Sequence, residues 1–272
     1  MRLNAISTYP VKGCHRLDHD GAVVQPWGLA GDRRWMVVDA DGVGVTQRET
    51  TRLVGLHATP RDGGLLLRAD GQPDLDVPEP AGGDPVLART FRNRKLPVPA
   101  LPAGPVADGW LSALLGRPVR LVWLAHPARH LAAAERAHDT GDQVSFADAY
   151  PLLLANAASL TALNDWLVEA GEDPVPMSRF RPNLVVEGAP AWAEDGWEGG
   201  SLRIGGVQFR AAGSCDRCVV TTTDQETGVR GREPLRTLAR YRNVRQKLLF
   251  GLHLVPVRTG QLVVGDPVSV DG

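Results

Sequence analysis

The chain has 272 residues, of which 43% are hydrophobic and 22% are charged, a composition typical of a folded globular protein. Its 30 basic and 31 acidic residues give a formal net charge of −1, so the chain lacks the basic excess of a protein that coats nucleic acid. Three cysteines are too few for a disulfide framework or for an iron–sulfur cluster held by four cysteines.

No apolar run approaches the roughly 20 residues that a membrane-spanning helix needs. The first 13 residues contain no apolar core of the kind that a secretory signal carries. We therefore expect a cytoplasmic protein that binds neither a membrane nor nucleic acid.

Short strands dominate the first 95 residues. A strand is expected over residues 3–8, and two apolar runs at 34–39 and 43–47, separated by Asp41-Gly42, predict a β-hairpin. Prolines crowd residues 97–105, which predicts an extended linker. A helix over 106–115 should follow the linker, with Gly116 placed to end it.

The remainder of the chain mixes strands with a few helices. Residues 125–143 favour a mobile loop, and the leucine spacing over 159–170 predicts a helix with Ser159 as its N-cap. Residues 218–223 are strongly β-branched and favour a strand, and 234–240 predict a short helix. This pattern predicts an α+β fold that is predominantly β and barrel-like, without a βαβ repeat.

Cys215 and Cys218 belong to a Cys-Asp-Arg-Cys motif for which three interpretations compete. A structural zinc site needs four ligands, usually from two such pairs, and only one pair is present. A thioredoxin-type redox pair begins a helix, whereas the residues after Cys218 favour a strand. Two inert buried thiols are the third interpretation. Arg217 argues mildly against inert thiols, because a neighbouring cation favours the thiolate that a soft metal requires.

Basic residues on predicted loops of both halves point to an anionic ligand. They are Lys12, Arg33, Arg34, Arg48, Arg179 and Arg181. Guanidinium groups bind phosphate through paired hydrogen bonds, so several of them at a cleft would suit a phosphorylated ligand. Because all but three of the 30 basic residues are arginine, each one taken alone is more commonly a solvated surface residue.

Several segments, in this order, resemble one known family. They are Tyr9-Pro-Val-Lys-Gly; Gly31-Asp-Arg-Arg-Trp-Met-Val-Val-Asp; Asp148-Ala-Tyr-Pro-Leu-Leu-Leu with Ala158-Ser-Leu-Thr-Ala-Leu-Asn; Arg179-Phe-Arg-Pro-Asn; Cys215-Asp-Arg-Cys with Thr221-Thr-Thr-Asp-Gln-Glu-Thr-Gly; Glu233-Pro-Leu-Arg-Thr-Leu; and Val264-Gly-Asp-Pro-Val. The chain resembles MOSC-domain proteins with a MOSC N-terminal β-barrel domain, similar to the mitochondrial amidoxime-reducing component and its bacterial relatives. The resemblance implies an N-terminal β-barrel-like domain over 1–95, a linker and helix over 96–117, and a MOSC β-barrel domain over 118–272.

The resemblance also implies a molybdenum cofactor, a pterin dithiolene that carries a phosphate. Cys218 is then the metal ligand and catalytic residue, and Cys215 is its neighbour in the cofactor site. Lys12 and Arg33 are implied at the phosphate, beside Gly13, which stands where the mitochondrial proteins have serine. A backbone N–H would replace that hydroxyl. Further cofactor contacts are implied for Asp148, Arg179, Arg181 and Asn183.

The function implied is reduction of small N-oxygenated substrates, with electrons from a separate ferredoxin or flavoprotein reductase. A sulfur carrier or sulfurtransferase working through a cysteine persulfide is the alternative. No pyridoxal-phosphate domain is present, so a partner would have to supply that sulfur. A non-catalytic protein that stores the cofactor is a third interpretation.

Overall fold

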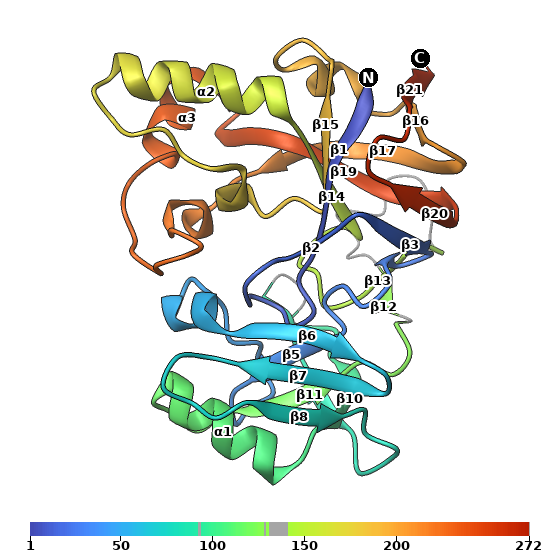
Figure 1. Ribbon diagram of the computed structural model, residues 1–272, viewed down its shortest axis with the longest axis vertical. Coiled ribbons are helices and arrows are strands. Elements are labelled where there is room, and N and C mark those ends of the chain that lie inside the picture. Colours follow the sequence, from blue (N-terminus) through green and yellow to red (C-terminus); the bar gives the residue numbers. More distant parts are fainter. Residues whose placement is uncertain (92–93, 128, 131–140, 272) are drawn as a thin grey trace.

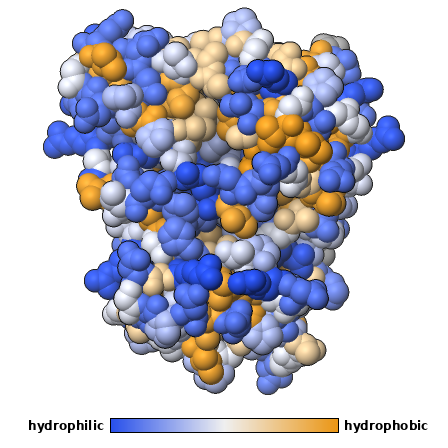
Figure 2. Space-filling model, in the orientation of Figure 1, coloured by the Kyte–Doolittle hydropathy of each residue, from blue (hydrophilic) through white to orange (hydrophobic). Residues whose placement is uncertain are grey.

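The computed structural model describes residues 1–91, 94–127, 129–130 and 141–271. Two lobes stack along the long axis of the molecule, and the chain passes between them (Figure 1). Hydrophilic side chains cover most of the waist between the lobes on the face shown in Figure 2. The predicted fold class, α+β with β structure predominant, is confirmed.

The upper lobe in Figure 1 is built on a nine-stranded sheet of order β2-β1-β15-β14-β19-β17-β16-β21, with β18 paired to β19. The strands are β1 (Arg2–Thr8), β2 (Leu17–His19), β14 (Leu152–Asn156), β15 (Leu184–Glu187), β16 (Ser201–Ile204), β17 (Val207–Asp216), β18 (Asn243–Val244), β19 (Lys247–Arg258) and β21 (Val268–Asp271). Only β14 and β15 pair in parallel among the ladders of this sheet in the described residues. A small sheet joins β20 (Gly260–Val263), β3 (Gly21–Gln25) and β4 (Gly28–Leu29).

N-terminal residues complete the core of this upper lobe. Leu3, Ile6 and Val24 are buried against Phe209 and Leu252, which come from the second half of the chain. Strand β1 pairs antiparallel with β15, and β3 pairs with β20. The domain boundaries predicted at residues 95 and 118 stay a prediction.

The lower lobe contains two further sheets and a helix. One sheet has the order β5-β11-β10-β9, and the other has the order β6-β7-β8. The strands are β5 (Trp35–Val38), β6 (His57–Arg61), β7 (Gly64–Arg68), β8 (Leu75–Pro78), β9 (Val86–Ala88), β10 (Val98–Pro102) and β11 (Arg120–Trp123). A separate pair, β12 (Arg129–His130) and β13 (Gln143–Val144), follows. Tyr9, Trp35, Leu67, Trp110 and Leu121 belong to the core of this lobe.

The described helices are short. They are α1 (Pro105–Leu115), α2 (Ala157–Glu169) and α3 (Leu235–Tyr241), with 3-10 turns η1 (Thr51–Gly55), η3 (Met177–Phe180), η4 (Ala193–Trp197) and η5 (Val219–Thr222). Helix α1 ends at Gly116, whose φ of 69° places it in the left-handed region, as the sequence predicted. Within the part of the chain that is described, no helix is long and apolar enough to cross a membrane.

One expectation for the lower lobe needs correction. Residues 98–102 of the predicted linker are extended, but they form β10 inside a sheet. Strand β9 pairs with one half of β10 and β11 with the other, so the prolines interrupt only part of each ladder. The predicted hairpin forms as a short one: Val38 bridges antiparallel to Gly44, and the Asp39 carboxylate accepts from the backbone N–H groups of Asp41 and Val43 at the turn. The longer ladder of β5 is with β11.

The N-cap of α2 is Asn156, not Ser159 as predicted. The Asn156 side chain accepts a hydrogen bond from the Ala158 N–H at 3.1 Å. Ser159 lies inside the first turn and is fully buried, and its hydroxyl donates to Glu194 at 2.9 Å. The Ser159 hydroxyl therefore bonds to a residue distant in sequence and does not cap the helix.

The predicted strand over 218–223 is also wrong, because these residues form the 3-10 turn η5. The Thr221 hydroxyl donates to the Cys218 carbonyl at 2.9 Å, and the Thr222 hydroxyl donates to the Val219 carbonyl at 2.8 Å. Local bonds of this kind offer the backbone an alternative to a sheet ladder. The loop expected over 125–143 falls largely on residues 131–140, which lie outside the described residues.

Candidate functional site

A pocket of about 200 Å³ is lined by residues from both halves of the chain. Eight of the nine predicted site residues line it: Lys12, Gly13, Arg33, Asp148, Arg181, Asn183, Cys215 and Cys218. Five basic side chains face two acidic ones in this lining: Lys12, Arg33, Arg48, Arg181 and Arg217 against Asp148 and Asp216. The excess of positive charge suits an anionic ligand.

Asp148, from the second half of the chain, binds two basic residues from the first half, and one of these also contacts Cys218. Lys12 is buried, and its Nζ donates to Asp148 at 2.6 Å and to the Phe146 carbonyl at 2.7 Å. Arg48 donates to the other Asp148 oxygen at 3.4 Å and, through Nη2, to Cys218 Sγ at 3.2 Å. Burial opposes ionisation of Asp148, but the Lys12 and Arg48 cations outweigh it and lower the pKa of this carboxyl from 3.8 to about 2.

Two arginines with unusual backbone conformations lie over one tyrosine ring. Arg33 and Arg181 have φ of 50° and 53°, and their guanidinium carbons lie 4.5 and 4.1 Å from the Tyr9 ring centroid. Arg33 pairs with Asp32, whereas Arg181 donates to the neutral side chain of Gln225 at 2.7 Å. Burial lowers the pKa of Arg181, and no carboxylate among the described residues pairs with it.

Asn183 is fully engaged within the protein. Its side-chain oxygen accepts from the Leu153 N–H and from Arg33, each at 3.2 Å. Its side-chain nitrogen donates to the Ser7 carbonyl at 3.1 Å and to Asp32 at 3.2 Å. Asn183 therefore fixes strand β1 and the Arg33 side chain in place.

Gly13 lies in a tight loop at the pocket wall. Its φ is 84°, and a Cβ there would come within 3.2 Å of Leu53, so a larger residue would be strained in this conformation. Gln47 donates to the Gly13 carbonyl at 2.8 Å and exchanges hydrogen bonds with Gln225. These amides connect the Lys12 loop to the segment that follows η5.

Cys215 is a buried thiol with basic neighbours. Arg217 donates to Cys215 Sγ at 2.9 Å and to the Phe180 carbonyl at 2.7 Å. Burial alone would raise the pKa of Cys215, but Arg217 and His253 outweigh it and lower that pKa from 9.0 to about 6. The His253 ring contacts the Tyr150 ring at a tilt of 31°, with ring centroids 4.6 Å apart, and its Nδ1 is buried without a hydrogen-bond partner among the described residues.

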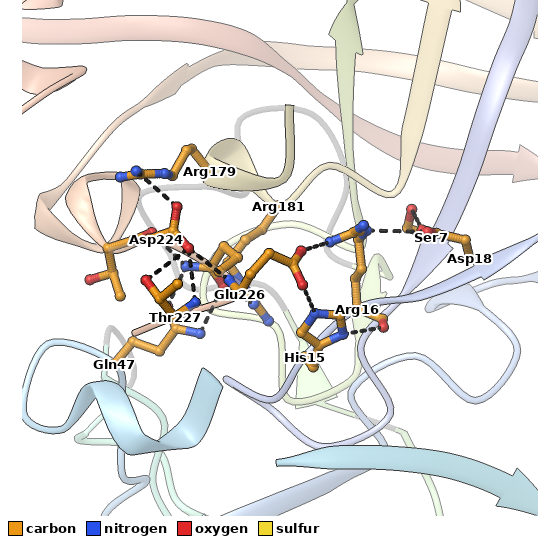
Figure 3. Close-up of polar contacts among 12 residues, drawn as sticks. Ser7, His15, Arg16, Asp18, Gln47, Arg179, Arg181, Asp224, Glu226 and Thr227 are labelled. Carbon is orange, nitrogen blue, oxygen red and sulfur yellow. Dashed lines mark hydrogen bonds and ion pairs between the residues drawn. The ribbon is translucent and has the colours of Figure 1, made fainter. Parts of the chain in front are cut away.

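Arg179 is the one predicted site residue that the pocket lining does not include. It donates to the Thr222 carbonyl at 3.0 Å and to Asp224 at 3.1 Å (Figure 3). Asp224 also accepts from the backbone N–H groups of Glu226 and Thr227. Arg179 therefore supports the segment after Cys218 from behind.

The same segment reaches the N-terminal half through Glu226. Its carboxylate accepts from His15 at 3.0 Å and from Arg16 at 2.5 Å, so two loops that are distant in sequence meet here (Figure 3). Arg16 also contacts Asp18, which accepts from the Ser7 hydroxyl. Ion pairs thus tie the loop after β1 to the turn after η5.

Sequence reasoning missed Gln47, Gln225 and His253. Gln225 lies inside a quoted motif, so its position was visible, but its pairing with Gln47 requires the fold. His253 lies alone in the apolar run of β19, where no spacing distinguishes it. No cluster of three or more histidine, cysteine or acidic side chains suited to a metal ion occurs among the described residues.

Comparisons with known proteins place the chain in a family. Residues 1–118 match the family model described as "MOSC N-terminal beta barrel domain", and residues 141–269 match "MOSC domain". The chain is 34% identical over 276 residues to "Mitochondrial amidoxime reducing component 2" of Bos taurus, covering 96% of this chain and 80% of that protein. The chain belongs to the MOSC family. It is likewise 34% identical over 284 residues to "Mitochondrial amidoxime-reducing component 1" of Homo sapiens, covering 97% of this chain and 81% of that protein.

In this MOSC protein the pocket draws on the regions matched by both family models. Lys12, Arg33 and Arg48 come from the region matched by the N-terminal model, and Asp148 and Cys218 from the region matched by the other. Neither region alone contains the basic lining together with the cysteine motif.

Proposed function

We propose that this MOSC protein is a reductase of small N-oxygenated compounds that depends on a molybdenum cofactor. The observation that carries the proposal is Cys218, a partly exposed thiol in a pocket whose charged lining is five basic side chains against two acidic ones. A thiolate is a suitable ligand for a soft metal, and the basic lining suits an anionic group attached to it. The names of the relatives support the substrate class.

The residues present fit the phosphate-bearing pterin at one particular point. Arg181 is a partly buried cation whose described hydrogen bond goes to a neutral amide. An unpaired buried charge is costly, and a bound phosphate would compensate it. Lys12, Arg33 and Arg181 would hold the phosphate end, and Cys218 would supply sulfur to the metal. When bound, the cofactor supplies the two-electron redox chemistry.

The chain's own side chains position the ligand and supply protons. Arg48 holds Cys218 Sγ and Asp148 together, so the thiol has a fixed direction. Reduction of an N–OH group to N–H releases water and consumes two electrons and two protons. His253 lines the pocket beside Cys215, and an imidazole can hold or pass a proton near neutral pH, so we assign proton delivery to this ring.

The electron donor in this proposal is a separate ferredoxin or flavoprotein reductase. We propose a cytoplasmic location for the reaction, without a membrane or nucleic-acid partner.

Cofactor content and turnover test the proposal together. The protein would be expressed in a host that makes the molybdenum cofactor and in a matched host that does not. Near-equal molybdenum and pterin per chain are expected from the first host only. Reduction of benzamidoxime by dithionite-reduced methyl viologen is expected from the same sample and not from Cys218→Ser. Cofactor-free protein from a host proven competent by a control molybdoenzyme would overturn the proposal.

The persulfide alternative is favoured by Cys215, since a thiol with a pKa near 6 is largely thiolate at neutral pH. A persulfide carrier would show a labile adduct of about 32 Da, one sulfur atom, that disappears in Cys215→Ser or Cys218→Ser. Bound cofactor with neither turnover nor adduct would instead indicate storage.

A further inference from the structure

A dense run of basic residues follows the cysteine motif. Residues 229–247 contain seven basic side chains and one acidic one, Glu233, although the whole chain has a net charge of −1. The basic residues are Arg230, Arg232, Arg236, Arg240, Arg242, Arg245 and Lys247. Positive charge is therefore concentrated locally.

Only part of this charge is neutralised within the protein. Arg236 pairs with Glu172 and Glu233, and Arg242 pairs with Asp195 at 2.5 Å. Four exposed cations make no ion pair within the described residues, and we name them the basic band: Arg232, Arg240, Arg245 and Lys247.

The basic band lies beside the cysteine motif. Helix α3 packs against η5, which starts at the residue after Cys218. At the start of β19, the Leu248 N–H donates to Asp216 at 3.0 Å, and the Arg217 N–H donates to the Leu248 carbonyl at 2.8 Å. Lys247 is thus next to the residue that pairs with the motif.

Exposed apolar side chains lie among these cations. Val219, Tyr241 and Val244 are 38%, 39% and 48% exposed. An apolar centre within a charged rim is typical of a surface that binds another protein. The charged rim also raises the rate at which an oppositely charged partner meets the surface.

The turn that carries Arg245 is strained. Arg245 and Gln246 have φ of 50° and 65°, and they connect β18 to β19 as a two-residue hairpin loop. Such turns strongly prefer Asn-Gly. A bulky cation held in this conformation costs stability, and strain of this kind concentrates where function requires the residue.

We propose that the basic band is the docking surface for an acidic electron-transfer protein. The inference rests on the proposed reductase function, because the pocket must then receive electrons. Each one-electron donor would give up one electron on docking. Two such encounters and two protons convert one N–OH group to N–H and water. Negative charge on the donor would complement the four cations of the basic band, and its redox centre would approach the exposed side chain of Val219, which follows the cysteine motif.

The test compares two donors on the holoenzyme. A plant-type [2Fe–2S] ferredoxin of strongly negative net charge is the protein probe, and reduced methyl viologen, a small cation, is the donor that needs no docking. Arg245→Glu/Lys247→Glu is expected to lower ferredoxin-driven benzamidoxime turnover by about tenfold at low salt. Viologen-driven turnover of the same variant should stay within about twofold of the parent.

A matched control uses cations at the other end of the same strand. Arg258 ends β19 on the order of 30 Å from Lys247, and Arg203 and Arg258 both lie beside Gln208 in the sheet. Both are exposed, so Arg203→Glu/Arg258→Glu makes the same charge change elsewhere and should leave ferredoxin-driven turnover unchanged. Arg245→Asn/Gln246→Gly removes one cation while relieving the turn. It should raise Tm and still lower ferredoxin-driven turnover.

Three results would overturn the docking proposal. Equal loss in the two charge-reversal variants would show a general charge effect. Absence of ferredoxin-driven turnover in a parent that works with viologen would exclude this donor class. Binding of phosphatidylglycerol vesicles that depends on Arg245 and Lys247, without ferredoxin-driven turnover, would assign the surface to a membrane. Failure of viologen-driven turnover in the parent would instead refute the reductase function itself.

Discussion

Arg48 Nη2 donates to Cys218 Sγ at 3.2 Å, so a residue from the first third of the chain touches the thiol at the centre of the candidate site. Nη1 of Arg48 donates to Asp148, and the guanidinium carbon lies 4.1 Å from the Phe91 ring centroid. Three contacts therefore hold the Arg48 side chain in one orientation at the pocket.

Replacement of Arg48 should make the Cys218 thiol less reactive. Reactive cysteines lie in electropositive, partly exposed surroundings, so Arg48→Met is expected to slow iodoacetamide labelling of Cys218 about three- to tenfold in cofactor-free protein. Site-resolved mass spectrometry measures the rate. Arg52→Met changes an exposed arginine four residues away and should leave the rate unchanged. An unchanged rate in Arg48→Met would refute a role for this contact.

The Lys12–Asp148–Arg48 cluster should make stability depend on acid pH. Because the folded pKa of Asp148 is depressed from 3.8 to about 2, its contribution is present above pH 4 and is lost as pH falls through about 2. That contribution is about 2 kcal/mol at neutral pH. Urea unfolding of the parent and of Asp148→Asn between these pH values measures it. The difference in free energy of unfolding between the two proteins should shrink toward pH 2, and a constant difference would contradict the assignment.

Cys215 should titrate well below an ordinary thiol. In a Cys218→Ser background, the ultraviolet absorbance of the thiolate should rise with a midpoint near pH 6 as Cys215 ionises. Cys14 does not contribute in this range, because burial raises its pKa to about 11. Arg217→Met should move the midpoint upward, and Arg217→Lys should restore most of the shift. The folded pKa is lowered, so the thiolate stabilises the fold fully above pH 9, and this stabilisation is lost as pH falls through about 6. A midpoint near 9 would refute the assignment.

Asn183→Ala should destabilise the protein by about 2 to 4 kcal/mol, because it leaves several buried groups without partners. The groups include the Leu153 N–H and the Ser7 carbonyl. Chemical unfolding measures the loss, and Asn243→Ala, at an exposed position in β18, provides the control. A loss no larger than in the control would show that Asn183 is dispensable for the fold.

Much of the fold and of the pocket could be predicted from the sequence, because helix ends and hydrophobic patterns depend mainly on residues that are close in sequence. Gly116 ends α1, and the β1 and α2 regions follow their hydrophobic patterns. The failures have a common cause, which is competition from bonds that depend on the fold. The threonines after Cys218 bond to nearby carbonyls, and Ser159 reaches Glu194, so neither follows its intrinsic preference.

The candidate site shows the same limit. Lys12, Asp148 and Cys218 lie on quoted motifs and line one pocket, but the arginine that joins them, Arg48, had no motif of its own. Arg179 shares a motif with Arg181 yet turns toward Thr222 and Asp224. Two arginines separated by one residue can thus face different surfaces, and their spacing in the sequence does not show which of them enters the pocket.

Strand β1 lies between β2 and β15 in the large sheet, so the region matched by the MOSC model is enclosed partly by the start of the chain. A chimaera that exchanges only residues 141–269 between two relatives would pair a foreign β15 with the resident β1 and place a foreign Phe209 against the resident Leu3 and Ile6. A chimaera designed to exchange donor or substrate preference within this family should therefore take the first 30 residues and the C-terminal segment from the same relative.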